Sequence, residues 1–210
     1  MKPKHEKKRV SFFWKLLKSL KKAFKVFTKY ITYSLFKFYN VKIEPSFQSN
    51  GIPYLSIQGE MTVGKNLSIN NNISSNPIGR NPKSIFVVRK NATLIIGENV
   101  GMSGTTIFCS KHIYIGNNVK LGGNVCIYDT DFHSLEAFER MDKKQDIKKT
   151  SKKSVIIEDN VFIGAHSTIL KGVKVGSNSI IGACSLVSNN IPPNEIWGGC
   201  PARFIKKVGI

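Results

Sequence analysis

Acidic residues are scarce in this sequence: 13 Asp and Glu stand against 32 Lys and Arg in 210 residues, which leaves a net charge of +19. So large a positive surplus points to an anionic partner, such as nucleic acid, acidic lipid or a phosphorylated ligand. Residues 1–40 hold twelve of the basic residues and one acid, Glu6, for a net charge of +11. The charge is therefore concentrated in the N-terminal segment.

Long apolar runs are absent, and cysteines are few. No stretch of 18 uncharged apolar residues occurs, so we expect no segment that spans a bilayer, and the N-terminus has no signal-peptide pattern. The cysteines have no metal-ligand spacing such as C-x-x-C, and a chain of this length can bury a core without disulfides. These absences predict a cytoplasmic protein with one main domain and an appendage. The four cysteines are Cys109, Cys126, Cys184 and Cys200.

Residues 10–31 carry apolar side chains at steps of three and four, with lysines in most of the gaps, which predicts an amphipathic helix. Such a helix can lie on an anionic membrane, with its aromatics among the acyl chains and its lysines at the head groups. Alternatively, the apolar stripe packs on the protein's own body or on another subunit. Nucleic acid is not expected as a partner, because no recognised nucleic-acid module accompanies the charge. The stripe consists of Phe13, Leu16, Leu17, Leu20, Phe24, Phe27 and Ile31.

An aliphatic residue returns at every sixth position in the C-terminal part, and a small residue usually follows it. A period of six is not helical, and simple strand alternation would not place a glycine beside each aliphatic residue. The pattern predicts short strands separated by sharp corners, with three sides closing each coil of 18 residues. The aliphatic positions are Ile157, Ile163, Ile169, Val175, Ile181 and Val187, with copies at Ile115, Leu121 and Ile127, at Ile96, and more weakly at Ile57, Val63 and Ile69.

Asparagine marks the expected corners. It lies three residues after an aliphatic position in five places, and it tolerates left-handed backbone angles better than most residues. The corner residues are Asn99, Asn118, Asn124, Asn160 and Asn178.

Over residues 57–208 this pattern resembles the hexapeptide-repeat acyltransferases, above all the galactoside, maltose and surface-polysaccharide O-acetyltransferases. The strings IPPN (191–194) and GCPAR (199–203) follow the C-terminal pattern of that family. The resemblance implies a left-handed parallel β-helix, although crossover connections are normally right-handed, so the handedness does not come from the period itself.

Together, the amphipathic segment and the resemblance predict an all-β solenoid, with a helical arm over residues 1–45, a β-helix domain over 46–208 and a short C-terminal tail. Two segments interrupt the repeat: a polar loop at 70–84 and a long insertion at 129–154. A loop as long as the second is usually functional or disordered. We expect it to reach toward a neighbouring subunit and help to enclose the active site.

Acetyl transfer to a hydroxyl needs a general base, for which histidine is suited, and a donor that stabilises the oxyanion. Of the four histidines, His5 lies in the charged tail, and we expect His112 at the surface and His166 at a coil corner. His133 lies in IYDTDFHS, where the last regular strand gives way to the insertion, a position typical of functional residues. The family carries its catalytic histidine at this point, so the resemblance implies that His133 is the base.

Asp129, Asp131 and His133 alternate, so a continuing strand would place all three on one face. A carboxylate there could orient the imidazole or bind a sugar hydroxyl; alternatively, both aspartates are solvated turn formers. We expect Asp131 to support His133 and Asp129 to contact the substrate. The surface-polysaccharide members resemble this D-x-D-x-H string, whereas the galactoside enzymes lack it.

The remaining site residues come from the resemblance alone. It assigns the oxyanion donor to the backbone N–H of Ala165 and places acetyl-CoA, a cosubstrate rather than a bound cofactor, along the coils. Ser103 is the nearest polar residue to the family's acceptor-binding asparagine. Without the family, the basic residues of the tail would be interpreted as solvated charges; with it, they suit phosphate groups. The predicted acetyl-CoA contacts are Ala165, Ala183, Ser188, Asn189, Arg203 and Lys206.

The sequence therefore predicts an acetyl-CoA-dependent O-acetyltransferase acting on a sugar of a cell-surface glycan or its precursor. We expect a homotrimer with active sites between prisms, without bound metal, in the cytoplasm and with the arm on the inner face of the membrane. The alternatives are an N-acetyltransferase of an amino sugar, a xenobiotic acetyltransferase and a non-catalytic β-helix binding protein. A γ-carbonic anhydrase needs three histidines on one metal, and the neighbours of His112, His133 and His166 do not match that pattern.

Overall fold

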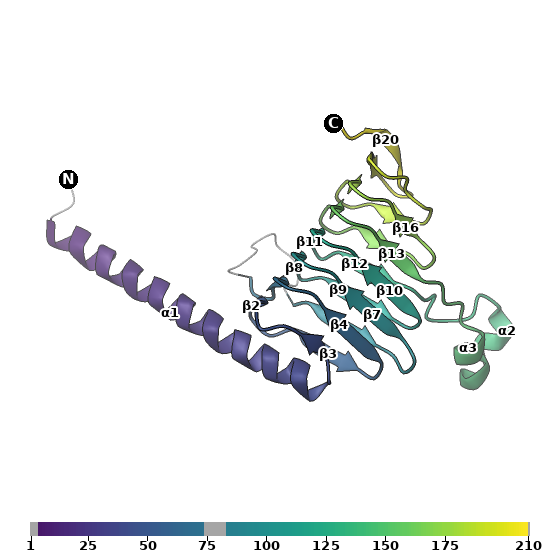
Figure 1. The fold of residues 1–210 in the computed structure, drawn as a ribbon, viewed down its shortest axis with the longest axis horizontal. Coiled ribbons are helices and arrows are strands. Elements are labelled where there is room, and N and C mark those ends of the chain that lie inside the picture. The colour runs from purple at the N-terminus through teal and green to yellow at the C-terminus, as the bar shows by residue number, and fades with distance from the viewer. Residues whose placement is uncertain (1–3, 74–82, 210) are drawn as a thin grey trace.

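The structure is a computed structural model that describes the backbone of residues 4–73 and 83–209, and side chains from Phe13 onward. Most of the predicted polar loop at 70–84, residues 74–82, lies outside the described residues. The strands stack into a triangular prism, a long helix lies at its N-terminal end, and a short helical insertion projects from its side (Figure 1).

The prism is a left-handed parallel β-helix, as predicted. Successive strands belong to three sheets in turn, and each pairs in parallel with the strand one coil further on. Sheet A comprises β1 (Lys42–Ile43), β4 (Glu60–Val63), β7 (Thr93–Ile96), β10 (His112–Ile115), β13 (Val155–Ile157) and β16 (Lys174–Val175). Sheet B comprises β2 (Gln48–Asn50), β5 (Ser68–Asn70), β8 (Gly101–Ser103), β11 (Lys120–Gly123), β14 (Phe162–Ile163), β17 (Ile180–Ile181), β19 (Glu195–Gly198) and β20 (Arg203–Lys207). Sheet C comprises β3 (Tyr54–Ile57), β6 (Ile85–Val88), β9 (Thr106–Cys109), β12 (Cys126–Tyr128), β15 (Thr168–Ile169) and β18 (Leu186–Val187).

The aliphatic positions of the six-residue repeat form the core, which confirms the predicted inward direction. Burying one such side chain contributes about 1.5–3 kcal/mol, and the repeat supplies one from each side of every coil. Even the weaker N-terminal copies are no more than 8% exposed. The residues after the aliphatic positions are small because the coils lie close together. A Cβ on Gly164 would lie 2.5 Å from the amide nitrogen of Ala183 in the next coil. The fully buried members include Ile115, Ile127, Ile157, Ile163, Ile169, Val175, Ile181 and Val187.

The corners between sheets A and B carry a column of six stacked asparagines, here called the asparagine ladder. Each has a positive φ between 57° and 62°, which confirms the reason for predicting asparagine at these corners. Each side-chain amide donates to the amide oxygen of the next asparagine, over 2.9–3.1 Å. The ladder therefore joins the side chains of neighbouring coils along one edge of the prism. Its members are Asn66, Asn99, Asn118, Asn160, Asn178 and Asn194.

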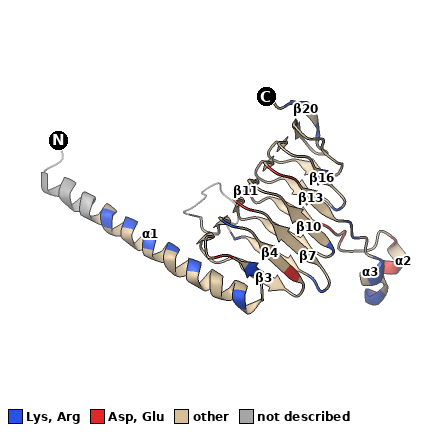
Figure 2. Ribbon diagram, in the orientation of Figure 1, with Lys and Arg blue, Asp and Glu red and all other residues tan. Residues whose placement is uncertain are grey.

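Helix α1 (Lys4–Phe38) is longer than the periodic segment 10–31 that predicted it. Its C-terminal half packs on the first coil through Thr28, Thr32 and Phe36, which lie one turn apart and are buried. The N-terminal half projects away from the prism (Figure 1), and lysines line its described length (Figure 2). Strand β1 starts at Lys42, so the first coil begins inside the predicted arm range of 1–45. Among the described residues, no helix is both long and apolar enough to cross a bilayer.

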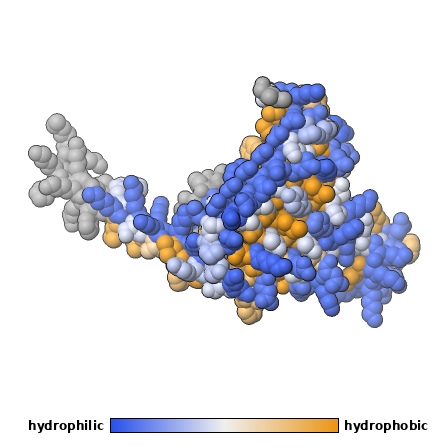
Figure 3. All heavy atoms as spheres, in the orientation of Figure 1, coloured by the Kyte–Doolittle hydropathy of each residue, from blue (hydrophilic) through white to orange (hydrophobic). Residues whose placement is uncertain are grey.

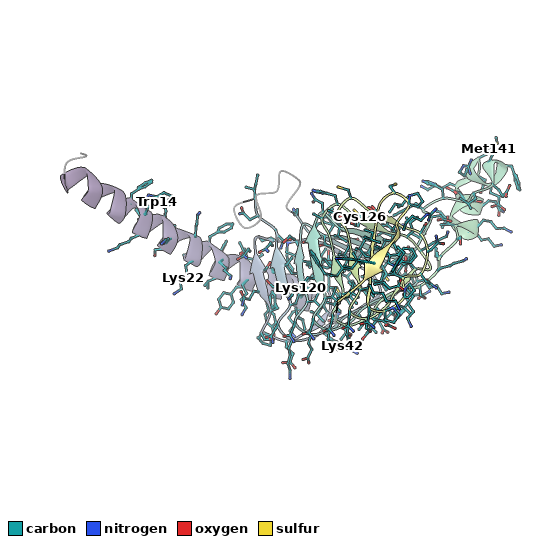
Figure 4. All side chains as sticks on the ribbon, turned by 90° about the horizontal axis from the view of Figure 1, so that it is seen from above. Trp14, Lys22, Lys42, Lys120, Cys126 and Met141 are labelled. Atoms are coloured by element: carbon teal, nitrogen blue, oxygen red, sulfur yellow. The ribbon has the colours of Figure 1, made fainter. Side chains whose placement is uncertain are left out.

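The insertion at 129–154 contains helices α2 (Ala137–Arg140) and α3 (Lys143–Lys149). It leaves the prism after β12 and returns at β13, and it projects on the side away from α1, with Met141 near its tip (Figures 1 and 4). The chain ends in the antiparallel pair of β19 and β20, which forms the predicted C-terminal tail.

Candidate active site

His133 forms an ion pair with an aspartate that the sequence analysis did not select. Its Nδ1 lies 2.7 Å from Oδ2 of Asp146, on α3. The imidazole side chain is 70% exposed, whereas that of Asp146 is only 12% exposed. With a proton on Nδ1 donated to the carboxylate, Nε2 carries the free lone pair and can accept a proton. The exposed histidine and its shielded carboxylate therefore form a dyad suited to general base catalysis.

The carboxylate of Asp146 is held from several sides. Its Oδ1 accepts the backbone N–H of Ser134 at 2.6 Å. The main-chain carbonyl oxygen of Asp146 accepts the Thr150 hydroxyl at 2.6 Å, which holds the residue on its helix. The hydrogen bond from His133 lowers the pKa of Asp146 most, followed by the Ser134 N–H, and the charge of Arg140 adds to the effect. The carboxylate thus stays ionised well below neutral pH, as an orienting group for an imidazole must.

The two ends of the insertion are joined where they meet the prism. Thr130 and Lys152 form an antiparallel bridge, and the Asp131 N–H donates to the carbonyl of Ser151 at 3.1 Å. The Lys153 N–H donates to the carbonyl of Asp129 at 3.0 Å. These backbone contacts join the two ends of the insertion and fix the position from which His133 emerges.

Phe132, just before His133, has a φ of 67°, a conformation costly for a bulky side chain and often found at functional sites. Its ring packs edge-on against Phe108, with centroids 4.8 Å apart, and against Tyr128, at 5.2 Å. These two residues lie side by side on the outer face of sheet C. The packing fixes Phe132 in the strained conformation and so directs the chain that carries His133.

The predicted support of His133 by Asp131 is wrong in this structure. Asp131 pairs instead with Lys171 of the next coil, with Nζ 2.9 Å from Oδ1. The strand does not continue as the alternation assumed, because the positive φ of Phe132 turns the chain between Asp131 and His133. Asp146, thirteen residues further along the chain, occupies the position expected for Asp131.

The predicted substrate contact of Asp129 is also corrected, because its side chain is fully buried. Its carboxylate accepts the backbone N–H groups of Ser110, Lys111 and His112 at 2.6–2.9 Å. The Cys109 thiol lies 3.6 Å away, and burial followed by the Asp129 charge raises its pKa to about 12. Asp129 therefore closes a turn inside the prism and does not face a substrate.

Ala165 and His133 belong to opposite edges of sheet C. Ala165 precedes β15 at the corner with sheet B, next to His166, whereas His133 follows β12 at the edge facing sheet A. Within the described part of the chain, no group accepts a hydrogen bond from the Ala165 N–H, and the residue is partly exposed. A single chain thus holds a free donor and an exposed base, but at different corners.

The other predicted site residues lie on several coils of the prism and on the C-terminal strand β20. Ala183 lies one coil beyond Ala165, whose carbonyl accepts the Cys184 N–H at 2.8 Å. Ser103 is partly buried, and its hydroxyl accepts the amide of Asn70 at 3.1 Å, so it faces its neighbour in sheet B. No group of three or more potential metal ligands occurs among the residues whose placement is described. The exposed members of the predicted acetyl-CoA set are Ala183, Ser188, Asn189, Arg203 and Lys206.

The role of His133 as the base stays a prediction, and the sequence analysis did not predict the contact of His133 with Asp146. The missed signal is a pattern around α3: Asp142 caps the helix by accepting the Gln145 N–H at 2.8 Å, and Asp146 follows one turn later. A capped helix of seven residues inside the insertion could have been predicted from this aspartate and the basic last turn. Which carboxylate meets His133 depends on how the insertion folds back.

Comparison with known proteins gives a consistent set of relatives. Residues 154–189 match the family described as bacterial transferase hexapeptide (six repeats). The chain is 40% identical to a galactoside O-acetyltransferase of Lactococcus lactis over 103 residues, 49% of this chain and 47% of that protein. It is 34% identical to the galactoside O-acetyltransferase of Escherichia coli over 106 residues, 49% of this chain and 48% of that protein. The chain thus spans about half the length of the curated relatives it matches.

Solved structures extend the likeness over most of the fold. A maltose O-acetyltransferase from Clostridium difficile superimposes with a TM-score of 0.54 and 25% identity, covering 88% of each chain. A hexapeptide-repeat acetyltransferase from Vibrio cholerae gives a TM-score of 0.50 and 30% identity over 56% of this chain and 64% of that one.

Proposed function

We propose that this chain is an acyltransferase of the hexapeptide-repeat kind, and that it transfers an acetyl group from acetyl-CoA to a hydroxyl group of a sugar. The relatives reported above are named for sugar O-acetylation or, more generally, as acetyltransferases. The acceptor we propose is a sugar of a cell-surface glycan or of its precursor.

The observation that carries this proposal is the dyad of His133 and Asp146. An exposed imidazole held by a shielded carboxylate can take a proton from an alcohol at neutral pH, and general base catalysis of this kind contributes about 10²–10⁴-fold to a rate. Asp146 stabilises the imidazolium that forms and keeps Nε2 directed outward.

The proposed reaction is a direct transfer with both substrates bound. Nε2 of His133 removes the proton of the acceptor hydroxyl while its oxygen attacks the thioester carbonyl carbon. The tetrahedral oxyanion accepts a hydrogen bond from the backbone N–H of Ala165. The C–S bond then breaks, and the imidazolium returns its proton to the departing thiolate, which gives CoA and the acetyl ester.

His133 and Ala165 can meet in this reaction only if two copies of the chain combine. They lie at opposite edges of sheet C, so we propose a homotrimer in which His133 of one copy faces Ala165 of the next. The insertion supports this arrangement, because its apolar side chains are exposed in the single chain and a neighbouring prism would cover them. These side chains are Leu135, Phe138, Met141 and Ile147.

The acetyl-CoA contacts remain as proposed from the resemblance. Small side chains at Ala165 and Ala183 leave room for the pantetheine arm beside successive coils. The exposed guanidinium of Arg203 and ammonium of Lys206, on β20, suit the phosphate groups. Ser188 and Asn189, which follow β18, complete the proposed set.

The decisive test is replacement of the base. We expect His133→Ala to lower the rate of thiol release from acetyl-CoA, with galactosides and maltose as probe acceptors, by about 10³-fold. His112→Ala is the matched control, because His112 uses only its backbone N–H toward Asp129 and should keep the wild-type rate. A His133→Ala protein that stays as active as the wild type would remove the proposal. Mass spectrometry of the products would establish the acetylated sugar.

A further inference from the structure

The apolar stripe of α1 is not the face on which the helix packs against the prism. The packed face contains Thr28 and Thr32, whose hydroxyls contact Ser49 of the first coil, and Phe36, whose ring contacts Phe47. At 100° per residue, the stripe lies roughly a third of a turn away from this face. The prism therefore leaves most of the stripe uncovered, and only Leu17 and Ile31 are partly buried.

The exposed part of the stripe runs from Phe13 to Phe27. Its side chains are 47–62% exposed, and it extends over about 21 Å at 1.5 Å per residue. An apolar surface of this length marks a binding site for a partner rather than scattered exposure. Figure 3 shows it as the orange side of the helix, opposite a blue side. The exposed members are Phe13, Leu16, Leu20, Phe24 and Phe27.

The charge of the helix indicates which partner covers the stripe. Residues 13–38 contain seven lysines and no acid, and they lie mainly on the side opposite the stripe. Packing this arm against the arm of a second copy would bring the seven lysines of each together. An anionic lipid surface instead offers acyl chains to the stripe and phosphates to the lysines. The seven are Lys15, Lys18, Lys21, Lys22, Lys25, Lys29 and Lys37.

A groove between the arm and the first coil has the same mixed chemistry. Its volume is about 530 Å³; Leu17, Leu20 and Phe24 contribute apolar walls, and Lys21 and Lys25 lie at the same groove. An apolar cavity beside ammonium groups suits an anionic amphiphile, with its chain inside and its phosphate at the lysines.

We propose that α1 lies in the plane of an anionic membrane, with the stripe among the acyl chains and the lysines at the lipid phosphates. The arm then holds the prism against the membrane surface without crossing it. This proposal rests on the arm alone, and it stands or falls independently of the acetyl-transfer reaction.

The test is co-sedimentation of the full chain with vesicles. We expect at least tenfold stronger binding to vesicles containing phosphatidylglycerol than to vesicles of phosphatidylcholine alone, and weaker binding at high salt. Equal binding to both, or no binding, would overturn the proposal. The reaction with a soluble acceptor, measured in the same samples, should not depend on vesicles.

Two kinds of variant separate the stripe from the charge. The triple change Phe13→Gln, Leu16→Gln and Leu20→Gln keeps the net charge and a good helix former at each position, and should reduce vesicle binding at least tenfold. Replacing Lys15, Lys18 and Lys22 by Glu should do the same. The same replacement at three exposed prism lysines lowers the net charge equally and should leave binding nearly unchanged. These control residues are Lys65, Lys90 and Lys111.

Sedimentation velocity tests the alternative that a second copy of the chain, rather than a membrane, covers the stripe. If the glutamine variant loses subunits from its assembly, and the wild type does not bind vesicles, a second copy covers the stripe and the membrane proposal is wrong. Circular dichroism of the variants establishes that α1 is still formed.

Discussion

The prism and its insertion are built from opposite kinds of contact. In the prism, like side chains stack from coil to coil, so every coil repeats the environment of its neighbours. In the insertion, each contact occurs once: His133 with Asp146, and the Ser134 hydroxyl with Glu139. Repeated contacts make a stiff scaffold, whereas single contacts can place one base at one point.

This difference predicts how substitutions divide. Changes to the prism should lower the free energy of unfolding and leave the chemistry of the folded molecules intact. Changes to the insertion should lower the rate and barely affect unfolding. Asp129 lies at the junction of the two regions. The effect of replacing it shows whether it acts as part of the prism or as part of the site.

The largest effect on stability is expected for Asp129→Ala. Three backbone N–H groups of the turn at 110–112 would lose their buried acceptor, so we expect a loss of about 4 kcal/mol in the free energy of unfolding. Urea denaturation measures this loss.

Asp131→Ala is the matched control, because it removes a carboxylate from the same string. Its pair with Lys171 is only about one-fifth exposed on both sides, so leaving Lys171 unpaired should cost about 1–3 kcal/mol, less than the loss expected for Asp129→Ala. If Asp129→Ala were as stable as Asp131→Ala but inactive, Asp129 would be a substrate contact after all.

Asp146→Asn should produce the next largest effect, on the rate. The amide can still accept the Ser134 N–H, but it no longer stabilises the imidazolium, so we expect kcat to fall about 10²-fold. The KM for the acceptor should change little, because the carboxylate is shielded from solvent by its neighbours. Thiol release under saturating acetyl-CoA measures both quantities.

Asp142→Asn makes the same chemical change four residues away, at the cap of α3, and asparagine also caps helices well. This variant should keep the wild-type kcat. Equal losses in the two variants would mean that Asp146 only supports the fold of the insertion.

The fold could be predicted from the sequence because the same six-residue pattern recurs in coil after coil. Ile157, Ile163 and Ile169 all point inward. Because the positions are equivalent, a wrong assignment at one of them would disagree with the assignments at its neighbours. The weak copies at Ile57 and Val63 still lie in the core, since the strands above them fix their register. The left-handed turn of the coil came from the resemblance, because a period has no handedness.

The site could be predicted only in part, for the same reason. His133 was predicted because it lies where the repeat stops, a position visible in the sequence, and because the resembling family carries its histidine there. Its carboxylate partner lies thirteen residues away on a helix with no periodic signal, and the alternation of Asp129, Asp131 and His133 assumed a strand. The positive φ of Phe132 breaks that strand, and nothing in a phenylalanine predicts it.

The smallest of these effects tests the prism at one rung of the asparagine ladder. Asn160→Ala removes the amide contacts to Asn118 and Asn178 and leaves a Cβ without a local hydrogen bond at a φ of 61°. We expect a loss of about 2 kcal/mol in the free energy of unfolding, part of it from the backbone conformation. Asn160→Gly loses the same amide contacts but adopts a positive φ freely, so it should cost less than alanine. Because glycine is normally the more destabilising of the two in regular structure, this reversed order in urea denaturation would identify backbone conformation as the reason for asparagine at the corners. The reverse result would assign the ladder's contribution to its amide hydrogen bonds alone.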